Sequence, residues 1–222
     1  MSHTSAPLDW RATAGGEVPV STLFDDPYYS LQGGLDETRH VFLDGNGLPD
    51  RVTGPFHIAE LGFGTGLNLL TTWAVWPDSP LTFTSFEAHP LDPDDMARAL
   101  AAFPVLAPLA ARLLEVWQPG AGPVRLSDHV TLHVILGDAR QTLPAWDGTA
   151  DAWYLDGFAP ARNPALWEPA LLAQVHAHTA PGGTAATYSA AGHVRRGLAD
   201  AGFTVTRLPG YGAKRHMTRA VR

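Results

Sequence analysis

The fold class is indicated by one glycine-rich stretch, which reads Phe56-His57-Ile58-Ala59-Glu60-Leu61-Gly62-Phe63-Gly64-Thr65-Gly66-Leu67-Asn68-Leu69-Leu70. An apolar run enters a turn of alternate glycines and an apolar helical stretch leaves it, which is the order of a strand, a tight loop and a helix. The glycines let the loop turn sharply and approach a ligand closely, while the first turn of the helix offers unpaired N–H groups. The stretch therefore predicts a nucleotide-binding loop.

An acid ahead of the glycines narrows the cofactor class. Glu60 would repel a pyrophosphate, but its carboxylate suits the cationic amino-acid end of S-adenosylmethionine, which it would orient directly or through backbone and water. The spacing E-x-G-x-G-x-G favours a class I methyltransferase over a dinucleotide dehydrogenase, which has G-x-G-x-x-G. Many α/β proteins carry a glycine-rich turn without a cofactor, so that alternative stays open at this point. The predicted cofactor contacts in the stretch are Glu60, Gly62, Phe63, Gly64, Thr65, Gly66 and Asn68.

Composition excludes several classes of function. With 222 residues, 45% of them hydrophobic, the chain can bury one sizeable core. It has no cysteine, which excludes disulfides, thiolate catalysis and cysteine-ligated metals. Its ten histidines lack metal-ligand spacing, so we expect no metal site. Residues 1–9 have neither a basic start nor an apolar segment, and no run is long enough to span a membrane, so we expect a cytoplasmic protein with no membrane partner.

Charge is divided unevenly along the chain. From Ala190 to the end, seven arginine and lysine residues face Asp200 alone, a net of +6, so the total of −7 leaves −13 on the remainder. A basic segment on an acidic body is compatible with docking an anionic polymer on one face. A solvated face on the last helix and strands explains the same cations equally well.

The first 54 residues lack the pattern of a nucleotide-binding unit. We interpret residues 1–54 as an extension or lid packed on the core, and residues 55–222 as the methyltransferase domain. Residues 38–43 are predicted to form a strand whose hairpin partner lies around residues 48–52. Two carboxylates beside two aromatic rings suit an amine carried by a flat base, although a helix N-cap followed by core aromatics explains them equally well. This cluster consists of Asp25, Asp26, Tyr28 and Tyr29.

Two further strands are predicted to lead into acids. The strand over residues 81–87 ends on Glu87, about 20 residues beyond the glycines, where α/β nucleotide folds place the acid that binds the ribose hydroxyls. The strand over residues 130–136 is followed by Gly137 and Asp138. In class I methyltransferases an acid at this point meets the adenine amino group. Asp138 is also suited to capping a short helix that follows it.

The fourth predicted strand, over residues 150–155, leads into another informative loop. This loop holds an acid, Asp156, a ring, Phe158, and rigid prolines at the carboxyl end of a central strand, where ligands bind in such sheets. These residues suit the transfer of a methyl group to a nitrogen carried by a nucleic-acid base. The loop is similar, without matching residue for residue, to the Asp/Asn-Pro-Pro-aromatic loop of amino methyltransferases.

The remaining pattern completes an α/β fold. Helices are predicted over residues 67–76, 93–100, 104–116, 139–143, 164–179 and 191–201, and further strands over residues 184–188, 203–208 and 216–221. Alternating strands and helices predict a Rossmann-like, mostly parallel seven-stranded sheet in which the final hairpin strand is antiparallel.

Taken together, the motifs resemble the methyltransferase domain of the MnmC family. They are F-x-x-A-E-L-G-F-G-T-G-L-N from residue 56, W-Y-L-D-G-F-A-P-A-R-N-P-x-L-W from residue 153, D-D-P-Y-Y-S, E-T-R-H-V-F-L, and residues 187–198 and 210–217. The resemblance covers nearly the whole chain. It implies S-adenosylmethionine-dependent N-methylation of 5-aminomethyl-2-thiouridine at the tRNA wobble position. In the bifunctional form an FAD-dependent oxidoreductase domain follows; this chain resembles the stand-alone version, so no FAD is implied.

The resemblance also implies roles for individual residues. Asp156 would hold the amine and accept or relay its proton, or mainly orient it, and Phe158 would stack on the extruded uracil ring. A separate oxidoreductase or upstream modification enzyme would supply the aminomethyl substrate. On the substrate side, the same loop would contribute Asn163, and phosphates of the tRNA anticodon stem-loop would meet Arg195, Arg196, Lys214 and Arg215.

Two alternatives stay open. Another class I methyltransferase, acting on a different nucleoside or on a small amine, would share the glycine loop and the strand-end acids but would not need the basic C-terminal segment. A non-enzymatic RNA-binding module on a methyltransferase scaffold would typically have lost the glycines or the acids, and all of these are present here.

Overall fold

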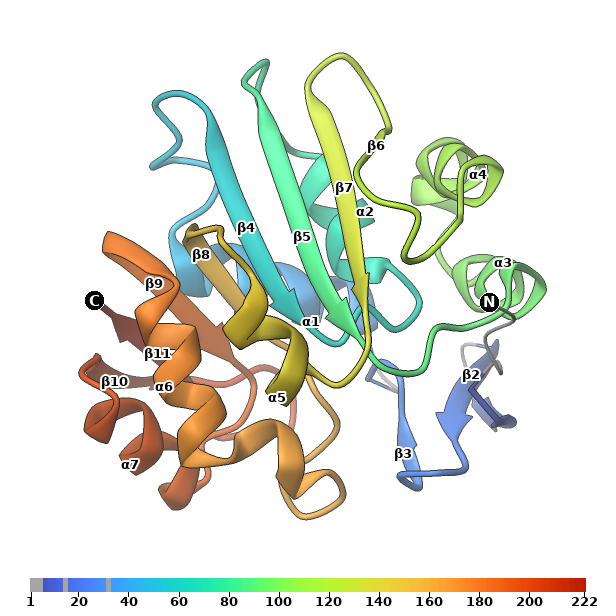
Figure 1. Ribbon diagram of the computed structural model, residues 1–222. Helices are drawn as coiled ribbons and strands as arrows, with labels where there is room; N and C mark the ends of the chain where they lie inside the picture. The colour runs from blue at the N-terminus through green and yellow to red at the C-terminus, as the bar shows by residue number, and fades with distance from the viewer. Residues whose placement is uncertain (1–5, 14–15, 31–32) are drawn as a thin grey trace.

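The computed structural model describes residues 6–13, 16–30 and 33–222, and its centre is an eight-stranded sheet with the order β10-β11-β9-β8-β4-β5-β7-β6 (Figure 1). The strands are β4 (Phe56–Leu61), β5 (Leu81–Glu87), β6 (Val124–Arg125), β7 (Val130–Leu136), β8 (Ala150–Leu155), β9 (Thr179–Thr187), β10 (Thr204–Pro209) and β11 (His216–Val221). Five of them, β4, β5, β7, β8 and β9, pair in parallel. β11 is antiparallel to both of its neighbours, and β6 is antiparallel to β7.

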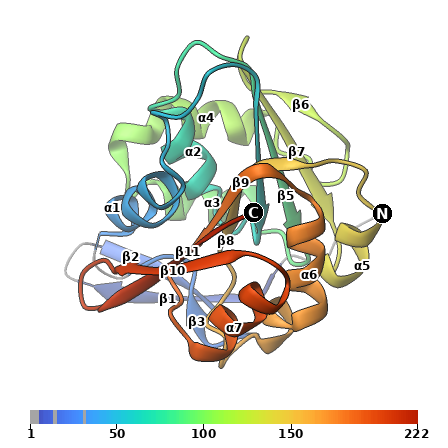
Figure 2. The same cartoon turned by 90° about the vertical axis from the view of Figure 1, so that its left-hand side faces the viewer.

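Helices cover both faces of this sheet. One layer contains α1 (Gly34–Thr38), α2 (Leu67–Trp73), α3 (Pro93–Leu100) and α4 (Ala107–Glu115), and the other contains α5 (Ala139–Thr142), α6 (Pro169–Ala177) and α7 (Gly192–Asp200) (Figure 2). Short helical turns, η2 (Pro104–Leu106) and η3 (Leu143–Ala145), adjoin α4 and α5. Neighbouring side chains on a strand point to opposite faces, so Trp153 joins the core under one layer and Tyr154 the core under the other.

The class of fold predicted from the sequence is confirmed. The bounds of β5, β7, β8, β11 and α3 are those predicted, and the final strand is antiparallel. The sheet has one strand more than the predicted seven, because residues 124 and 125 add a short edge strand to β7. Two residues are too few to leave an alternating pattern in a sequence.

The predicted strand at residues 38–43 is wrong. This segment ends α1 and continues as a π-helix, η1 (Arg39–Asp44), while residues 48–51 form turns rather than a hairpin partner. A strand alternates its two faces, but Val41, Phe42 and Leu43 are all buried, as a helical segment packed between α2 and the sheet allows. The consecutive apolar residues therefore belong to a helix face.

The predicted helix over residues 164–179 is interrupted. It consists of η4 (Pro164–Trp167) and α6, with Glu168 in an extended conformation between them. A residue that precedes a proline is disfavoured in the helical region, and Glu168 precedes Pro169. The last predicted residues of the helix, from His178 on, lie outside α6, and Thr179 begins β9.

A small antiparallel sheet precedes these elements. It consists of β1 (Leu8–Thr13), β2 (Gly16–Ser21) and β3 (Asp26–Pro27), and it lies at the end of the central sheet toward which the arrowheads of β4, β5 and β7 point (Figure 1). Residues 1–5, part of the stretch considered as a leader, lie outside the described residues. Within the described part of the chain, no helix has the length and apolar character needed to cross a membrane.

Candidate active site

A cavity of about 780 Å³ opens where β4, β5, β7 and β8 end, and its volume lies in the range of small-molecule sites. The chain runs from β4 to β5 on one side of the sheet, whereas β8 flanks β4 on the other, and ligands bind at such a reversal. The predicted site residues that line the cavity are Asp26, Tyr28, Tyr29, Gly62, Phe63, Gly64, Thr65, Asn68, Glu87, Gly137, Asp138, Asp156, Phe158, Asn163 and Lys214. Six others do not line it, although all are described: Asp25, Glu60, Gly66, Arg195, Arg196 and Arg215.

The glycine loop owes its shape to contacts with the protein as well as to its open side. Gly62 has φ +88°, and a Cβ there would lie 2.5 Å from the carbonyl oxygen of Asp156. Gly66 packs on the core, where a Cβ would lie 2.9 Å from Leu113. At Gly64, with φ +54°, a Cβ would lie 3.2 Å from the ring of Tyr28, which also lines the cavity. Of the three glycines, only Gly64 has the role that the sequence suggested, because its missing side chain would project toward the ring of a cavity residue.

Glu60 lies behind the cavity wall. Its side chain is fully buried, and its two oxygens accept hydrogen bonds from the Asn68 amide at 2.8 Å and from the Ser85 hydroxyl at 2.7 Å. Burial holds the pKa of the Glu60 carboxyl well above its ordinary value. Since Glu60 does not line the cavity, the structure leaves it the indirect of the two predicted routes to a ligand.

The same amide holds the carboxylate at the end of β8. Asn68 Nδ2 donates a second hydrogen bond to Asp156 Oδ2 at 2.6 Å, and Asn68 Oδ1 accepts one from the Thr38 hydroxyl at 3.0 Å. Burial raises the pKa of the Asp156 carboxyl from 3.8 to about 7; the Asn68 hydrogen bond opposes this rise, and the charge of Glu37 adds to it. Asp156 therefore changes its protonation state near neutral pH, inside the cavity.

Glu87, at the end of β5, fixes the chain on either side of the cavity. It accepts hydrogen bonds from the backbone N–H of Gly64 at 3.1 Å and from that of His89 at 2.6 Å. Its side chain is nearly buried but lines the cavity. Glu87 thus holds the glycine loop in place and presents a carboxylate to whatever the loop binds.

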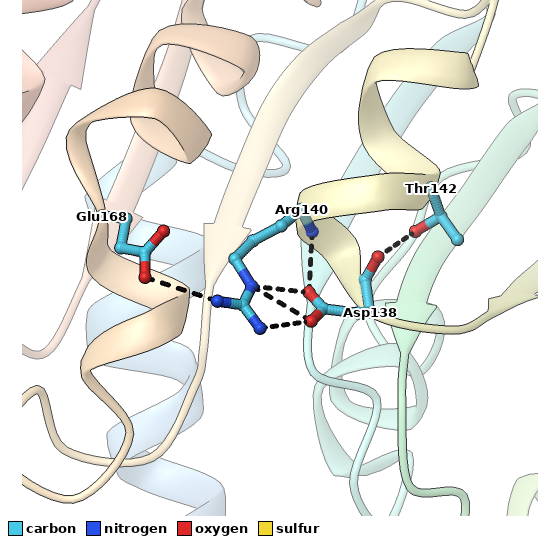
Figure 3. Close-up of polar contacts among 4 residues, drawn as sticks. All are labelled: Asp138, Arg140, Thr142 and Glu168. Carbon is cyan, nitrogen blue, oxygen red and sulfur yellow. Dashed lines mark hydrogen bonds and ion pairs between the residues drawn. The ribbon is translucent and has the colours of Figure 1, made fainter.

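Asp138 has the capping role that the sequence also allowed. It accepts from the backbone N–H of Arg140 at 2.9 Å, so it caps α5, and Arg140 extends from there to Glu168, at 3.4 Å, between η4 and α6 (Figure 3). The Arg140 guanidinium also donates to both carboxylate oxygens of Asp138 and holds the pKa of that carboxyl below its ordinary value. Asp138 is therefore an ionised carboxylate at the cavity edge.

Three aromatic rings, those of Phe24, Tyr28 and Phe158, form one wall of the cavity. The Phe158 ring stacks on that of Phe24 with centroids 4.8 Å apart, and Tyr28 meets it edge-on at 5.2 Å. Asp26 Oδ2 accepts the backbone N–H of Ala159 at 2.7 Å, which ties the N-terminal segment to the loop after β8. Of the N-terminal cluster, Tyr28 thus lies against Phe158 and Asp26 holds the backbone just after it, whereas Tyr29 meets Phe103 edge-on at 5.1 Å.

The N-terminal acid Asp25 and the C-terminal cations lie at the rim or beyond it. Asp25 pairs with Arg162 at 2.9 Å outside the cavity. Lys214, on the loop between β10 and β11, lines the cavity but pairs with Glu37 at 2.6 Å. In the described part of the chain, no carboxylate pairs with the three remaining predicted phosphate contacts, which are Arg195 and Arg196 on α7 and Arg215 on the same loop as Lys214.

Many residues that line the cavity were not predicted as site residues, and Glu37 and Tyr188 are the two that matter most for its chemistry. Glu37 comes from α1, in the segment adjoining the wrongly predicted strand, and Tyr188 follows β9. Tyr188 donates a hydrogen bond to the carbonyl of Gly157 at 2.8 Å. Both residues stand in segments quoted for the family resemblance, and a helical reading of residues 34–44 is the signal that would have drawn attention to Glu37.

The strand order and the site define the class of protein. A glycine loop after a central parallel strand, acids at the ends of the neighbouring strands and an antiparallel penultimate strand in the sheet order are the features of the class I methyltransferase fold. Among the residues that the structure describes, no group of three or more acidic or histidine side chains is arranged to hold a metal ion.

Comparison with known proteins assigns the family. The sequence model of a family described as S-adenosyl-L-methionine-dependent methyltransferase matches residues 105–222, and the chain belongs to this family. Its cofactor is therefore S-adenosylmethionine, as the glycine loop predicted. The crystal structure of MNMC2 from Aquifex aeolicus is similar with a TM-score of 0.78 and 25% identity, covering 97% of this chain and 70% of that one.

Two curated relatives carry the same name, tRNA 5-methylaminomethyl-2-thiouridine biosynthesis bifunctional protein MnmC. The one from Chromobacterium violaceum is 45% identical to this chain over 98% of the chain and 34% of the relative. The one from Ralstonia nicotianae is 48% identical over 91% of the chain and 33% of the relative. The resemblance to MnmC found in the motifs is confirmed, and the chain spans about a third of the length of these relatives.

The geometry of Gly64 predicts the effect of one substitution on cofactor binding. Gly64→Val places a branched side chain at φ +54° and within contact of Tyr28, so the loop has to move away from the cavity. We expect calorimetry to show no measurable binding of S-adenosylmethionine or its demethylated product. Gly54→Val is the matched control, because a Cβ at Gly54 meets nothing within 4 Å. Wild-type affinity in Gly64→Val would contradict this view of the loop.

Proposed function

We propose that this chain transfers a methyl group from S-adenosylmethionine to the primary amine of 5-aminomethyl-2-thiouridine at the tRNA wobble position, giving 5-methylaminomethyl-2-thiouridine. The observation that carries the proposal is one cavity that combines the methyltransferase glycine loop with a carboxylate of raised pKa, Asp156, and with the ring of Phe158. Similarity to proteins named for the biosynthesis of this nucleoside supports the choice of substrate.

The cavity residues fit S-adenosylmethionine. The glycine loop and Tyr28 both line the cavity, and Glu87 and Asp138 would offer carboxylate acceptors for ribose hydroxyls and for the adenine amino group. Glu60 would act on the amino-acid end only through Asn68. The bound cofactor supplies a methyl group on a cationic sulfur: the amine nitrogen bonds to the methyl carbon while the carbon–sulfur bond breaks and leaves its electron pair on sulfur.

Asp156 would prepare the amine for this displacement. The nitrogen attacks only with a free lone pair, so one proton must leave it, and a base whose pKa lies near the working pH is the most effective acceptor. The pKa of Asp156, about 7, meets this condition. Asn68 holds Oδ2, and among the described residues no hydrogen bond reaches Oδ1, which is the oxygen we assign to the amine. Fixing the two reacting groups side by side would supply most of the rate.

The aromatic wall would hold the base. Phe24 already covers one face of the Phe158 ring, so the uracil would use the other face, beside the Tyr28 edge. Anticodon bases lie in a single-stranded loop, and extruding one costs only its stacking in the loop. Stacking on a protein ring returns ~1–3 kcal/mol per base. Tyr29 and Asn163 also line the cavity and would contact the nucleoside.

The remaining parts of the chain would serve the tRNA. We propose that residues 1–54 form an extension that closes the cavity over the base, on the methyltransferase domain of residues 55–222. Arg195, Arg196, Lys214 and Arg215 would contact phosphates of the anticodon stem-loop. A separate oxidoreductase or an upstream modification enzyme would supply the aminomethyl group, and a tRNA substrate would place the protein in the cytoplasm.

One observation favours a second candidate, methylation of another nucleoside or a small amine. Two cations that line the cavity are already paired with carboxylates, Arg140 with Asp138 and Lys214 with Glu37, and Arg162 outside the cavity pairs with Asp25. A rim neutralised in this way is less suited to phosphates than one with free cations. The unpaired arginines of α7 lie outside the cavity and have to supply the attraction that a tRNA needs.

The proposal is tested by methyl transfer. Labelled S-adenosylmethionine and the protein should methylate tRNA whose wobble base is 5-aminomethyl-2-thiouridine, and nucleoside analysis should find the label in 5-methylaminomethyl-2-thiouridine. The same tRNA without the aminomethyl group is the control and should stay unlabelled. Transfer to free amines but to no tRNA would favour the second candidate.

The role of Asp156 predicts a pH profile. Wild-type turnover should rise with pH and level off above about 7, because only the ionised carboxylate accepts a proton. Asp156→Asn should lower turnover by ~10²-fold, the scale of a lost general base, and recover part of it at high pH as the amine loses its proton to water. Folding raises the pKa of Asp156 from 3.8 to about 7, so the folded wild type loses stability as pH rises through this range. The Asn side chain cannot ionise and escapes this loss, so the variant should unfold no more easily than wild type at pH 8. If the Asp156→Asn variant keeps the turnover of the wild type across the pH range, Asp156 has no part in the mechanism.

The arginines of α7 predict a change in salt dependence. Reversing Arg195 and Arg196 to Glu should weaken tRNA binding and flatten its dependence on salt, because phosphate contacts set that slope. Affinity for S-adenosylmethionine should stay unchanged, since neither residue lines the cavity. Filter binding over a range of salt concentrations measures the slope, and an unaltered slope would assign these arginines to a solvated face.

A further inference from the structure

Glu37 gives the cavity an acidic group that the proposed chemistry does not yet use. Its side chain comes from α1, is only 11% exposed, and accepts a hydrogen bond from the ammonium of Lys214 at 2.6 Å. The same ammonium lies 4.2 Å from the centre of the Tyr188 ring. Glu37, Lys214 and Tyr188 all line the cavity, so this arrangement faces the space where the substrate would bind.

A carboxylate beside an aromatic face is a receptor for an ammonium group. The carboxylate supplies a charge-assisted hydrogen bond, and the ring adds a cation–π attraction. The group that occupies this receptor is a primary alkyl ammonium, that of Lys214. A protonated aminomethyl group on a uracil has the same chemistry at its end: one NH₃⁺ on a CH₂.

The two members of the ion pair are not equally free to part. Lys214 belongs to the β10–β11 loop, and 44% of its side chain is exposed, so its ammonium can return to water at little cost. Glu37 is nearly buried, and a buried carboxylate that loses its partner is strongly destabilised. Exchange of one ammonium for another is therefore much more favourable than opening of the pair.

We propose that Glu37 and Tyr188 form the subsite for the primary amine of the substrate, and that Lys214 fills this subsite until the substrate amine displaces it. The identity of the amine rests on the function proposed above. Once displaced, Lys214 lies on an exposed loop beside Arg215 and is free to meet a phosphate. Recognition of the amine and recognition of the nucleic acid backbone are then coupled through one side chain.

The placement of α1 connects this subsite with Asp156. Glu37 and Thr38 are consecutive, and Thr38 donates its hydroxyl to the Asn68 amide that holds Asp156. The charge of Glu37 raises the pKa of Asp156, and the charge of Lys214 lowers it. Replacing Lys214 by a substrate ammonium keeps one positive charge near both carboxylates, and the amine arrives where Asp156 can accept its proton.

The experiment compares the affinity of two tRNAs in the presence of S-adenosylhomocysteine. One carries 5-aminomethyl-2-thiouridine at the wobble position, and the other carries 2-thiouridine. Wild type should prefer the first, and Glu37→Gln should reduce this preference by about tenfold or more, the scale of a charge-assisted hydrogen bond, without changing affinity for the second. Asp36→Asn is the matched control, because Asp36 lies on the same helix, is exposed and pairs with Arg39 at the surface. This control should keep the wild-type preference.

Two results would overturn the subsite. The first is a wild-type preference near one, and the second is a preference that Glu37→Gln leaves intact. If the Glu37–Lys214 pair serves only to connect α1 to the β10–β11 loop, Glu37→Gln should weaken the binding of both tRNAs equally and lower the unfolding temperature of the protein.

A second probe separates the subsite from the proposed tRNA function. If wild type methylates no tRNA, benzylamine, an aminomethyl group on a flat ring, is titrated into Lys214→Met by calorimetry. The subsite predicts saturable binding that the added Glu37→Gln change abolishes and that benzyl alcohol does not reproduce. Absence of benzylamine binding would then overturn the subsite as well.

Discussion

A single side-chain amide, that of Asn68, holds the two carboxylates around which the site is built. Its two N–H bonds go to Glu60 and Asp156, and its oxygen accepts the Thr38 hydroxyl, so the amide joins the ends of β4 and β8 to α1 at the first turn of α2. Each carboxylate left without a donor in such surroundings costs ~1–3 kcal/mol or more, since charged groups lose most. The amide therefore fixes the positions of both carboxylates and also influences the pKa of Asp156.

The cavity is completed by segments that are not part of the central sheet. Asp26 holds the loop after β8, Tyr28 covers the gap that Gly64 leaves, and α1 brings Glu37 inside. In the function proposed here, the central sheet and its glycine loop hold the cofactor, whereas these N-terminal contacts and the β10–β11 loop select the methyl acceptor.

Much of this architecture was predictable from the sequence, because β5 alternates apolar and polar residues and β8 is a short apolar run. An acid that lines the cavity ends β5 and another directly follows β8. The pattern failed where burial does not alternate, as at residues 38–43, which are helical, and where an edge strand has two residues, as at β6. It left both a direct and an indirect route from Glu60 to the ligand open, and in the structure Glu60 hydrogen-bonds Asn68, which lines the cavity, but does not line the cavity itself. The partners of Glu37 and Asp138 are Lys214, 177 residues away, and Arg140, two residues away; no local pattern predicts the first.

The claim that joins these observations is that the pKa of the Asp156 carboxyl lies near 7, so that its ionised form can accept a proton from an amine. The most direct measurement is a ¹³C NMR titration of the Asp156 carboxyl in protein labelled at aspartate, with Asp156→Asn used for assignment. The account predicts a midpoint at about 7 without ligand. It also predicts a lower midpoint with S-adenosylmethionine than with S-adenosylhomocysteine, because only the former brings a cationic sulfur to the cavity. A midpoint near the ordinary value of 3.8 that neither ligand changes would contradict it.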